Sequence, residues 1–324
     1  FQIAPCFRDE DARADRSPGE FYQLDMEMAF ASQEDVFAVI EDVLPPVFAK
    51  YGIYKEASKA PFARISYRDA LEKYGSDKPD LRIDLVLQDA TEVLADCGFG
   101  PFDGQCVEAI VVDQFTATRK VIDKICADVE VQSGQKAYWF KLDENGELVG
   151  GIAKFLQERK EAVIEKLGLK KGDFVGLTAG KKGDALKGAG VLRKYLGMNS
   201  EAHMKQNCYE FCWIVDFPMY EIGEESGELE FCHNPFSMPQ GGMDALCNAD
   251  PLSINAYQYD LVCNGVELSS GAVRNHDPEI MVKAFEIVGL GEDAVKAKKC
   301  LKEHILRCIK QVLSVLKKYS MILF

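Results

Sequence analysis

The alternation of apolar and polar side chains is strictest near the start of the chain, where it predicts two strands. Residues 1–7 are mostly apolar, and residues 20–30 alternate between an apolar and a polar face. The apolar face of the second strand carries Tyr22, Leu24, Met26, Met28 and Phe30, and its polar face carries Gln23, Asp25 and Glu27. We therefore expect a half-buried strand whose carboxylates lie on one side of a sheet.

Two helices with recognisable start signals follow these strands. Ser32-Gln33-Glu34-Asp35 is typical of a capping box, and apolar residues continue at helical spacing until Pro45-Pro46, where we expect the helix to end. Its packing face consists of Val36, Phe37, Ile40, Val43 and Leu44. A second box, Ser66-Tyr67-Arg68-Asp69, predicts a short helix that ends at Gly75.

The pattern changes between about residues 85 and 195, where short strands alternate with helical stretches. Strands are predicted at 106–112 and 137–142, and helices at 118–129, 153–167 and 184–195. Such alternation is typical of a compact α+β module. The glycines at 98–100 and 176–182 fit neither the dinucleotide fingerprint nor the P-loop, so we assign no chemistry to this part.

After residue 195 the chain returns to apolar strands, now with charged residues among them. Residues 211–217 predict a buried strand, and residues 259–274 contain Asp260, Glu267 and Arg274. Asp260 and Glu267 would face opposite ways on one regular strand, but a bulge at Asn264-Gly265 would place both on one side. Paired carboxylates suit Mg²⁺ that is held mainly by substrate phosphates. The Ser-Ser-Gly bend can direct Arg274 into the same pocket. The alternative is a ladder of charges along an edge strand.

The end of the chain loses this organisation. Asp277-Pro278 predicts the start of a helix that runs to Gly289. Beyond Gly291 the chain is basic, with apolar residues at helical spacing from Leu301 to Leu316. A membrane-surface helix is one interpretation. We prefer a truncated or frame-shifted end, packed as a helix or not packed at all.

Composition limits the class of protein. A length of 324 residues allows two domains or one large one. The net charge of −14 argues against a general nucleic-acid coat, so any RNA contact must be local. The eleven cysteines, mostly in apolar runs, indicate a reduced, cytosolic protein, and no apolar run approaches a membrane span. Because the chain opens inside a strand without an initiator methionine or a signal peptide, we expect a fragment.

The two N-terminal strands are connected by a loop of alternating charge. It runs from Arg8 to Arg16 and ends at the turn residues Ser17-Pro18-Gly19. One interpretation is a solvated loop whose charges pair with one another. The other notes that Arg8 stands at the loop base, beside Asp25 and Glu27. A guanidinium next to paired carboxylates suits a ligand with phosphate and ammonium groups.

At these residues the chain resembles a known family. FRDEDARADRSPGEFYQLDMEM resembles the second signature motif of class II aminoacyl-tRNA synthetases in its bacterial aspartyl form. YGSDKPDLR, from Tyr74 to Arg82, looks like a further hallmark of these enzymes, and NGVELSSGAVR is similar to a run that ends in an arginine in the family. Residues 85–195 resemble the GAD insertion domain, a binding and positioning module that also occurs in a subunit of a tRNA-dependent amidotransferase.

The resemblance implies an ATP site at both ends of the chain. Arg8 would hold the α-phosphate of ATP together with the carboxylate of aspartate, Glu10 would contact the adenine end, and Asp9 would belong to the same site. Glu267 would bind ATP with Mg²⁺, and Asp260 would assist the metal. Arg8 and Glu267 are thus the implied catalytic residues.

The resemblance also implies the positions that recognise aspartate and tRNA. The implied aspartate site consists of Arg8, Gln23, Asp25, His233 and Arg274. Gln23 and Asp25 would receive the ammonium group, and Arg274 would bind the side-chain carboxylate. A histidine before an Asn-Pro turn is more often structural, so His233 has this role only through the resemblance. Arg13 and Arg16 would contact the acceptor end of tRNA.

The fold implied is α+β, with a class II synthetase-like antiparallel sheet flanked by helices and interrupted by a smaller GAD-like insertion domain. The catalytic domain would comprise residues 1–84 and 196–291, the insertion domain residues 85–195, and an atypical tail residues 292–324. The chain departs from the family at Ser17, where glutamine is common, and at Asn234, which replaces a second histidine. Beyond Gly291 the glycine-rich third motif is missing.

The activity implied is ATP-dependent activation of L-aspartate to aspartyl-adenylate, followed by transfer to the 3′ end of tRNA(Asp). Whether tRNA(Asn) is also charged stays open. ATP as substrate, Mg²⁺, a homodimer, a cytoplasmic location and no membrane association belong to this expectation. One alternative is a non-catalytic tRNA- or protein-binding module built on the GAD-like domain, which the missing third motif favours. Another is a tRNA-independent relative that adenylates aspartate for amide synthesis, which the inserted module disfavours.

Overall fold

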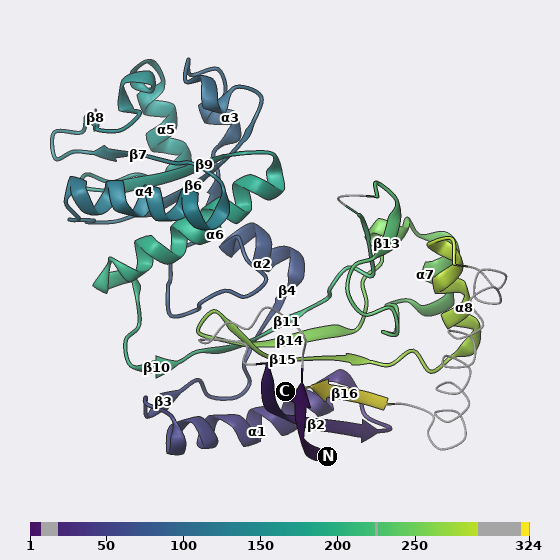
Figure 1. Cartoon of the computed structure of the whole chain (residues 1–324). Helices are drawn as coiled ribbons and strands as arrows, with labels where there is room; N and C mark the ends of the chain where they lie inside the picture. The colour runs from purple at the N-terminus through teal and green to yellow at the C-terminus, as the bar shows by residue number, and fades with distance from the viewer. Residues whose placement is uncertain (8–18, 224–225, 291–318, 324) are drawn as a thin grey trace.

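The computed structural model describes residues 1–7, 19–223, 226–290 and 319–323, and two separate sheets dominate it (Figure 1). The larger sheet has seven strands in the order β1-β2-β16-β15-β14-β11-β4. Their bounds are Gln2–Phe7 (β1), Glu20–Ala29 (β2), Tyr319–Leu323 (β16), Val266–Val273 (β15), Gln258–Cys263 (β14), Phe211–Val215 (β11) and Ala63–Ser66 (β4). Neighbouring strands are antiparallel except β11 and β4, which run parallel. The predicted antiparallel sheet is confirmed.

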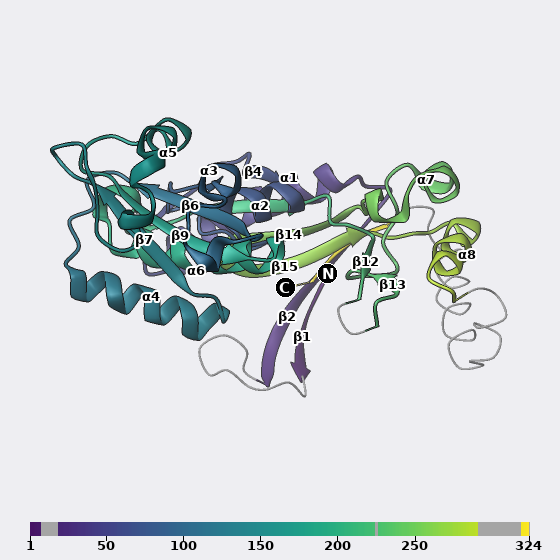
Figure 2. The ribbon, with the colours of Figure 1, turned by 90° about the horizontal axis from the view of Figure 1, so that it is seen from above.

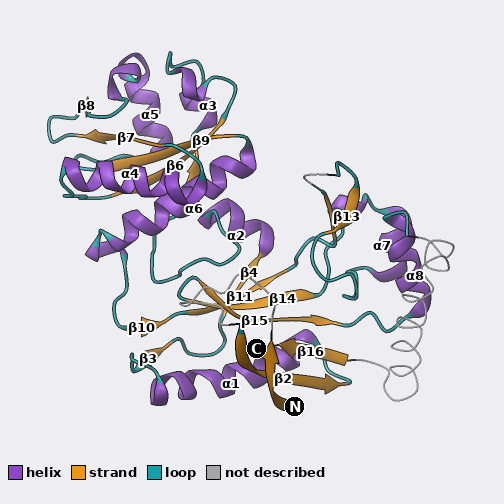
Figure 3. Ribbon diagram, in the orientation of Figure 1, coloured by secondary structure: helices purple, strands orange, loops and turns teal. Residues whose placement is uncertain are grey.

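Helices cover both faces of this sheet (Figure 3). On one face lies α1, Gln33–Tyr51, and on the other lies the short α2, Tyr67–Tyr74. Phe37 of α1 stacks on Trp213 of β11 with ring centroids 4.0 Å apart. The core beneath α1 consists of Val36, Phe37, Ile40, Leu44, Phe62, Phe211, Trp213, Val215, Tyr259, Leu261 and Cys263. The opposite face of the same strands packs on Ala70 of α2.

The start signal of α1 is confirmed, but its predicted end is wrong. Ser32 and Asp35 form the capping box, and the helix then continues through Pro45 and Pro46 to Tyr51. A proline inside a helix costs about 3 kcal/mol because it removes a hydrogen bond and crowds the preceding turn. Leu44 and Phe48 contact the core on either side of the two prolines, and their burial offsets part of this cost. Val43, expected on the packing face, is 44% exposed.

The apolar face of β2 is buried only in its middle. Met26 and Met28 pack against the core under α1, as the alternation predicts. Tyr22 and Phe30 lie at the two ends, and they are 73% and 72% exposed. Phe30 has a φ of 58°, so the extended backbone, and with it the alternation, has already ended there. Figure 2 shows that β1 and β2 extend away from the rest of the sheet, which leaves the far end of the hairpin without a covering helix.

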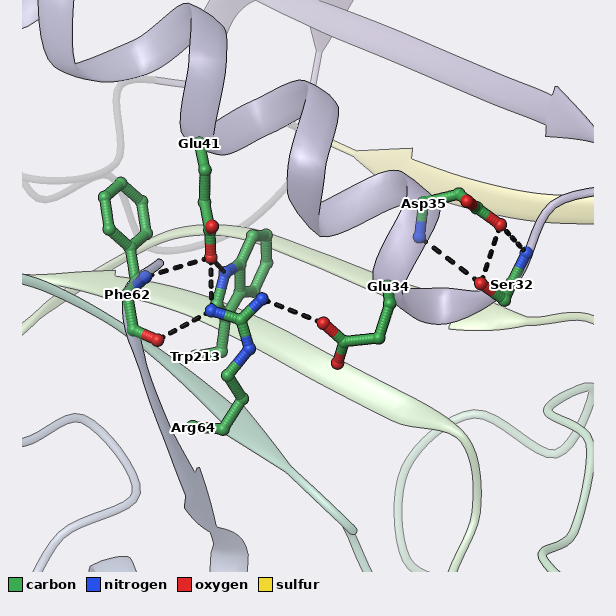
Figure 4. A network of polar contacts seen from close by, with 7 residues as sticks. All are labelled: Ser32, Glu34, Asp35, Glu41, Phe62, Arg64 and Trp213. Atoms are coloured by element: carbon green, nitrogen blue, oxygen red, sulfur yellow. Dashed lines mark hydrogen bonds and ion pairs between the residues drawn. The ribbon is translucent and has the colours of Figure 1, made fainter. Parts of the chain in front are cut away.

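A buried carboxylate ties α1 to the sheet (Figure 4). Glu41 accepts hydrogen bonds from Phe62 N at 3.1 Å and from Trp213 Nε1 at 3.0 Å. It also pairs with the guanidinium of Arg64, whose other nitrogen lies 2.9 Å from Glu34 Oε2. The buried charge is thus neutralised and its oxygen is fully used, which is the condition under which a buried carboxylate is tolerated.

The second sheet has five strands and lies between α2 and β11 in sequence. Its order is β5-β6-β9-β7-β8, with antiparallel neighbours throughout. The bounds are Leu87–Asp89 (β5), Cys106–Val112 (β6), Phe174–Gly180 (β9), Ala137–Leu142 (β7) and Leu148–Val149 (β8). Its helices are Thr91–Leu94 (α3), Arg119–Ser133 (α4), Lys160–Leu167 (α5) and Lys182–Met198 (α6).

This five-stranded unit has a hydrophobic core on each face of its sheet. One core includes Leu94 of α3 and Val163 of α5, and the other includes Ile122 of α4 and Leu192 of α6. The strands predicted at 106–112 and 137–142 are confirmed. The helical stretch predicted at 153–167 begins as short 3₁₀ turns and becomes α-helical only at Lys160. The domain boundaries derived from the sequence stay predictions.

Smaller elements complete the main body. They are Glu56–Ala57 (β3), Cys208–Tyr209 (β10), Tyr220–Ile222 (β12), Leu229–Phe231 (β13), Gly242–Asn248 (α7) and Pro278–Ile287 (α8). The helix α8 begins as predicted, since Asp277 accepts hydrogen bonds from Glu279 N and Ile280 N. No helix in the described part of the chain combines the length and the apolar character needed to cross a bilayer.

The C-terminal prediction is wrong for the residues that the structure describes. The predicted basic helix, 301–316, lies outside the described residues. Residues 319–323 form β16, which pairs with β2 on one side and β15 on the other. Two facing strand edges expose rows of N–H and C=O groups, and an inserted strand satisfies both rows. The end of the chain is therefore part of the main sheet.

Stability is expected to depend on the protonation of Glu108. This residue of β6 is 6% exposed and lies opposite Asp89 of β5. Burial, together with the charge of Asp89, raises the pKa of Glu108 to about 7. The folded state therefore holds a proton that the unfolded state has lost, so the free energy of unfolding should fall as the pH rises from about 4.5 to 7.

Replacing Glu108 by glutamine removes the charge and keeps the shape. We expect the variant to gain up to about 3 kcal/mol of stability at pH 8 and little at pH 4, since one pKa unit corresponds to about 1.4 kcal/mol. Urea unfolding at both pH values measures this difference. The exposed Glu92→Gln on α3 is the matched control. A Glu108→Gln variant that is equally stabilised at both pH values would contradict the assignment.

Candidate active site

The β14–β15 hairpin builds the most complex part of the site. Asn264 and Gly265 form its two-residue turn, with φ values of 53° and 80°. Positive φ at both turn positions is the geometry that an Asn-Gly pair favours. Val262 pairs with Glu267, whereas Leu261 pairs with Ser269, so the register shifts by one residue at Leu268. The predicted bulge is therefore present, but it lies at Leu268. Asn264 and Gly265, where it was expected, form the turn instead.

The hairpin and its bulge decide which side chains share a face. Cross-strand partners lie on the same face of a sheet, so the pairing of Val262 with Glu267 places Glu267 on the side of Asp260. The extra residue at Leu268 then brings Ser270, Ala272 and Arg274 to that same face. Glu267 and Arg274 are seven residues apart and would point to opposite faces without the bulge.

These side chains line a cavity of about 490 Å³. Its lining residues are Asp77, Lys78, Phe217, His233, Asn234, Gln258, Asp260, Glu267, Ser270, Gly271, Ala272 and Arg274. They come from the hairpin and the residue that follows it, from the loop after α2, from the segment after β13 and, for Phe217, from the segment after β11. The cavity lies on the face of the larger sheet opposite to α1, because Tyr259 and Leu261, which alternate with Asp260, pack beneath α1.

One end of the cavity carries carboxylates. Burial raises the pKa of Asp260 to about 8, and the neighbouring Glu267 carboxylate adds to this effect. Lys78 Nζ lies 3.3 Å from Glu267 Oε2 and 2.6 Å from Asp77 Oδ2. Burial disfavours the charged ammonium, but the hydrogen bond that it donates to Asp77 and the surrounding carboxylates outweigh this effect, so the pKa of Lys78 is raised. Lys78 thus stays a cation within an acidic group.

Asp260 and Glu267 fit a divalent cation bound by few protein ligands. Both are oxygen donors on one face. Burial, and after it the charge of Glu267, raises the pKa of Asp260, and a bound cation would favour the charged carboxylates against both effects. Within the described ranges, no group of three or more His, Cys, Asp or Glu side chains could hold a metal. Mg²⁺ often keeps several waters and substrate phosphates in such sites, so two carboxylates are sufficient.

The other charged position is Arg274. It follows β15, and its backbone bridges to Ser237. Burial lowers the pKa of Arg274, while the carboxylate of Glu27 on β2 acts in the opposite direction. A half-buried guanidinium that lines a cavity can recognise a carboxylate through two parallel hydrogen bonds.

His233 lies at the rim of the cavity. Its ring is 5.1 Å from the ring of Phe217 and 6.2 Å from that of Tyr67, both edge-on. Its neighbour Asn234 accepts a hydrogen bond from Phe236 N at 2.9 Å, which closes the turn around Pro235. His233 is thus held by aromatic contacts, and both it and Asn234 reach the cavity.

Gln23 and Asp25 lie on the same sheet face as the cavity but outside its lining. Gln23 Nε2 donates to Asp25 Oδ1 at 2.5 Å, and Gln2 Nε2 donates to Asp25 Oδ2 at 3.0 Å. The Cα partners Asp25, Leu323 and Ser270 form a row across three strands, so Asp25 shares the face of Ser270. The strand β16 separates β2 from the hairpin.

Five predicted site residues lie outside the described residues. These are Arg8, Asp9, Glu10, Arg13 and Arg16. Among the other predicted residues, His233, Asp260, Glu267 and Arg274 meet at one cavity. Their roles stay predictions.

Sequence reasoning missed several residues of the cavity. Asp77 and Lys78 belong to a segment noted only as a charged turn and a family hallmark, and Gln258 and Ser270 were not considered. A signal was present for Gln258 and Ser270. Asn264-Gly265 between alternating runs is a strong hairpin indication, and the pairing of the two strands places Gln258 opposite Ala272 and Ser270 opposite Asp260.

Comparisons with known proteins agree with each other. The family model described as tRNA synthetases class II (D, K and N) matches residues 1–308. The aspartate–tRNA ligase of Streptomyces coelicolor is 52% identical over 299 residues, which cover 91% of this chain and 50% of that protein. The aspartate–tRNA(Asp/Asn) ligase of Zymomonas mobilis is 52% identical over 302 residues, with the same shares of 91% and 50%.

The chain spans about half the length of the curated relatives that it matches. Among solved structures, an aspartyl tRNA synthetase from Entamoeba histolytica aligns with 99% of this chain and 42% of its own, at a TM-score of 0.40 and 17% identity. We draw no conclusion from that structural likeness. The fold class is supported by the family match and by the antiparallel sheet itself.

Proposed function

The chain belongs to the class II tRNA synthetases, in the group for D, K and N, and we propose that it is part of an enzyme that activates L-aspartate with ATP and transfers it to tRNA. The observation that carries the proposal is the cavity, which has a carboxylate pair, Asp260 and Glu267, and a half-buried arginine, Arg274, on one face. The first suits a metal-bound nucleotide and the second a small dicarboxylic amino acid. The names of the relatives above support aspartate as the amino acid.

The proposed reaction needs no protein nucleophile. An oxygen of the aspartate α-carboxylate forms a bond to the α-phosphorus of ATP, while the bond from that phosphorus to the leaving pyrophosphate breaks. The 3′-terminal hydroxyl of tRNA then attacks the activated carbonyl and loses its proton, and AMP leaves. Catalysis would come from the positions of the reactants and from charges directed at the phosphate.

Five cavity residues have a proposed part in this reaction. Arg274 would pair with the side-chain carboxylate of aspartate, and Lys78 would add a second positive charge nearby. Asp260 and Glu267 would hold Mg²⁺, which the family generally uses with ATP and which would supply positive charge to the phosphates. His233 would contact aspartate.

The residues of β2 and of the charged loop have proposed parts as well. Gln23 and Asp25 would orient the ammonium group. Arg8, with Asp9 and Glu10, would contact ATP, and Arg13 and Arg16 would contact the tRNA acceptor end. The five-stranded unit would be the GAD-like insertion domain. A homodimer, a cytoplasmic location and the charging of tRNA(Asn) stay predictions for the intact protein.

Aspartate-dependent exchange between ATP and pyrophosphate tests the proposal, with and without tRNA. We expect exchange with aspartate and not with asparagine, and we expect Arg8→Ala to reduce it by about 10²- to 10³-fold, as the loss of one group that stabilises charge in the transition state does. The exposed Arg68→Ala on α2 is the matched control. Unchanged exchange in Arg8→Ala would refute the role of Arg8, and tRNA binding without any exchange would favour the non-catalytic binding module.

A further inference from the structure

The loop between α2 and the five-stranded unit carries two cavity residues. It runs from Gly75 to Arg82 and brings Asp77 and Lys78 into the cavity of the main body. The loop is polar, and within it Asp80 forms a two-pronged ion pair with Arg82, at 3.0 and 2.7 Å. The position of Lys78 therefore depends on what holds the two ends of this loop.

Helix α6 of the five-stranded unit holds the first end. Gly75 ends α2 with a φ of 67°, and its backbone lies directly against Gly190 in α6. A Cβ atom on Gly190 would lie 2.3 Å from the carbonyl oxygen of Gly75, far inside van der Waals contact. The two backbones can approach this closely only because neither residue has a side chain.

The same helix holds the second end through Arg193. This side chain is 2% exposed, and its guanidinium lies 4.8 Å above the ring of Tyr74. It donates hydrogen bonds to the carbonyl oxygens of Asp80 at 3.1 Å, Leu85 at 2.6 Å and Ile83. One arginine thus binds three backbone carbonyl groups along the segment that leads out of the loop.

The loop contacts the cavity hairpin on its other side. The turn residue Gly265 lies against the loop, since a Cβ atom there would be 3.3 Å from Asp80 Cβ and 3.7 Å from Lys78 O. Lys78 Nζ reaches Glu267 Oε2 at 3.3 Å. The loop is therefore packed between α6 and the β14–β15 hairpin.

We infer that α6 sets the position of Lys78 in the cavity, with Gly190 and Arg193 as positioning residues for the binding of the anionic amino acid. The five-stranded unit thereby takes part in substrate recognition without touching the substrate. The inference rests on the proposed function in taking aspartate as the ligand. A displacement of about 1 Å of a positioned group can cost up to about 10²-fold in rate, so a small shift of the loop is sufficient for a measurable effect.

Gly190→Ala is the sharpest variant. It adds one methyl group at the contact with Gly75, and alanine is a better helix former than glycine, so α6 itself should persist. Gly183→Ala is the matched control, because it is the same change in the same helix with no atom within 4 Å of the added Cβ. We expect Gly190→Ala to raise the KM for aspartate about tenfold, with the KM for ATP close to that of Gly183→Ala. Its melting temperature should lie below that of Gly183→Ala, because the backbone of Gly75 has to move to admit the methyl group.

A second measurement does not depend on activity. Lys78 is held by Asp77 and Glu267, so its amine should react slowly with an acylating reagent, and mass spectrometry of the labelled peptide reports the rate. We expect several-fold faster labelling of Lys78 in Gly190→Ala and in Arg193→Lys, which keeps the charge but loses the fork of donors. Labelling equal to that of Gly183→Ala would overturn the inference, and so would equal rises in both KM values. If the wild type shows no exchange, the proposed function fails, while the labelling still tests the inference.

Discussion

Replacing Arg274 by glutamine is expected to lower kcat/KM for aspartate by about 10³- to 10⁴-fold, with ATP affinity within about twofold of the wild type. Arg274 is half-buried, lines the cavity on the face of Glu267, and is the side chain proposed to pair with the carboxylate of aspartate. Glutamine keeps the polarity but removes the charge and the two-pronged geometry. The carboxylate of a bound aspartate would then be desolvated without a full partner.

Asparagine sharpens the same test. Its amide is neutral, so discrimination between aspartate and asparagine should fall in Arg274→Gln by nearly as much as the aspartate activity itself. Arg274→Lys is expected to remain strongly impaired, because a point charge does not reproduce the planar fork. Arg68→Gln, an exposed arginine in an ion pair with Glu72, is the matched control. Equal losses for aspartate and ATP would remove the specificity role.

The second large effect concerns stability. We expect Glu41→Leu to lower the free energy of unfolding by about 3 to 5 kcal/mol, the range seen when one partner of a buried ion pair is removed. Phe62 N and Trp213 Nε1 would lose their acceptor inside the core, and Arg64 would lose its buried carboxylate partner while it keeps Phe62 O and Glu34. Urea unfolding followed by tryptophan fluorescence measures the change, and Trp213 itself reports on the site.

Arg64 supplies a matched control for this effect. Its other carboxylate partner, Glu34, is 65% exposed, so Glu34→Leu should cost less than about 1 kcal/mol. Glu41→Gln keeps an acceptor for Trp213 and is expected to lie between the two. Similar losses in Glu34→Leu and Glu41→Leu would show that burial does not decide the strength of this network.

The local signals in the sequence predicted most of the elements. Ser32 and Ser66 cap helices because a side-chain oxygen there satisfies a free backbone N–H, which requires no knowledge of the rest of the fold. The strands 106–112 and 137–142 were also predicted from local sequence, because each is a short and mostly apolar run between helical stretches. The end of α1 was not, because the packing of Phe48 against β11 and β10 outweighs the local preference of Pro45 and Pro46.

Without the family resemblance, which supplied His233, the site was predictable only where its residues are near one another in sequence. Asp260, Glu267 and Arg274 belong to one hairpin, and they were found together. Lys78 reaches the same cavity from a loop about 190 positions away, and its place depends on contacts with α6 and Gly265 that no local pattern encodes. The strand β16 escaped prediction for a related reason, since its sequence carries no sign that β2 and β15 leave a gap between them.

The extra residue at Leu268 makes the length of the chain part of the chemistry of the cavity. If one residue of the regular stretch 269–273 were deleted and the bulge kept, every charged side chain of the hairpin would be retained, yet Glu267 and Arg274 would be turned to opposite sides of the sheet. A comparison of related chains that scores only residue identity would report such a deletion as harmless. Spacing between these two positions is therefore a more sensitive sign of a working cavity than the presence of either residue.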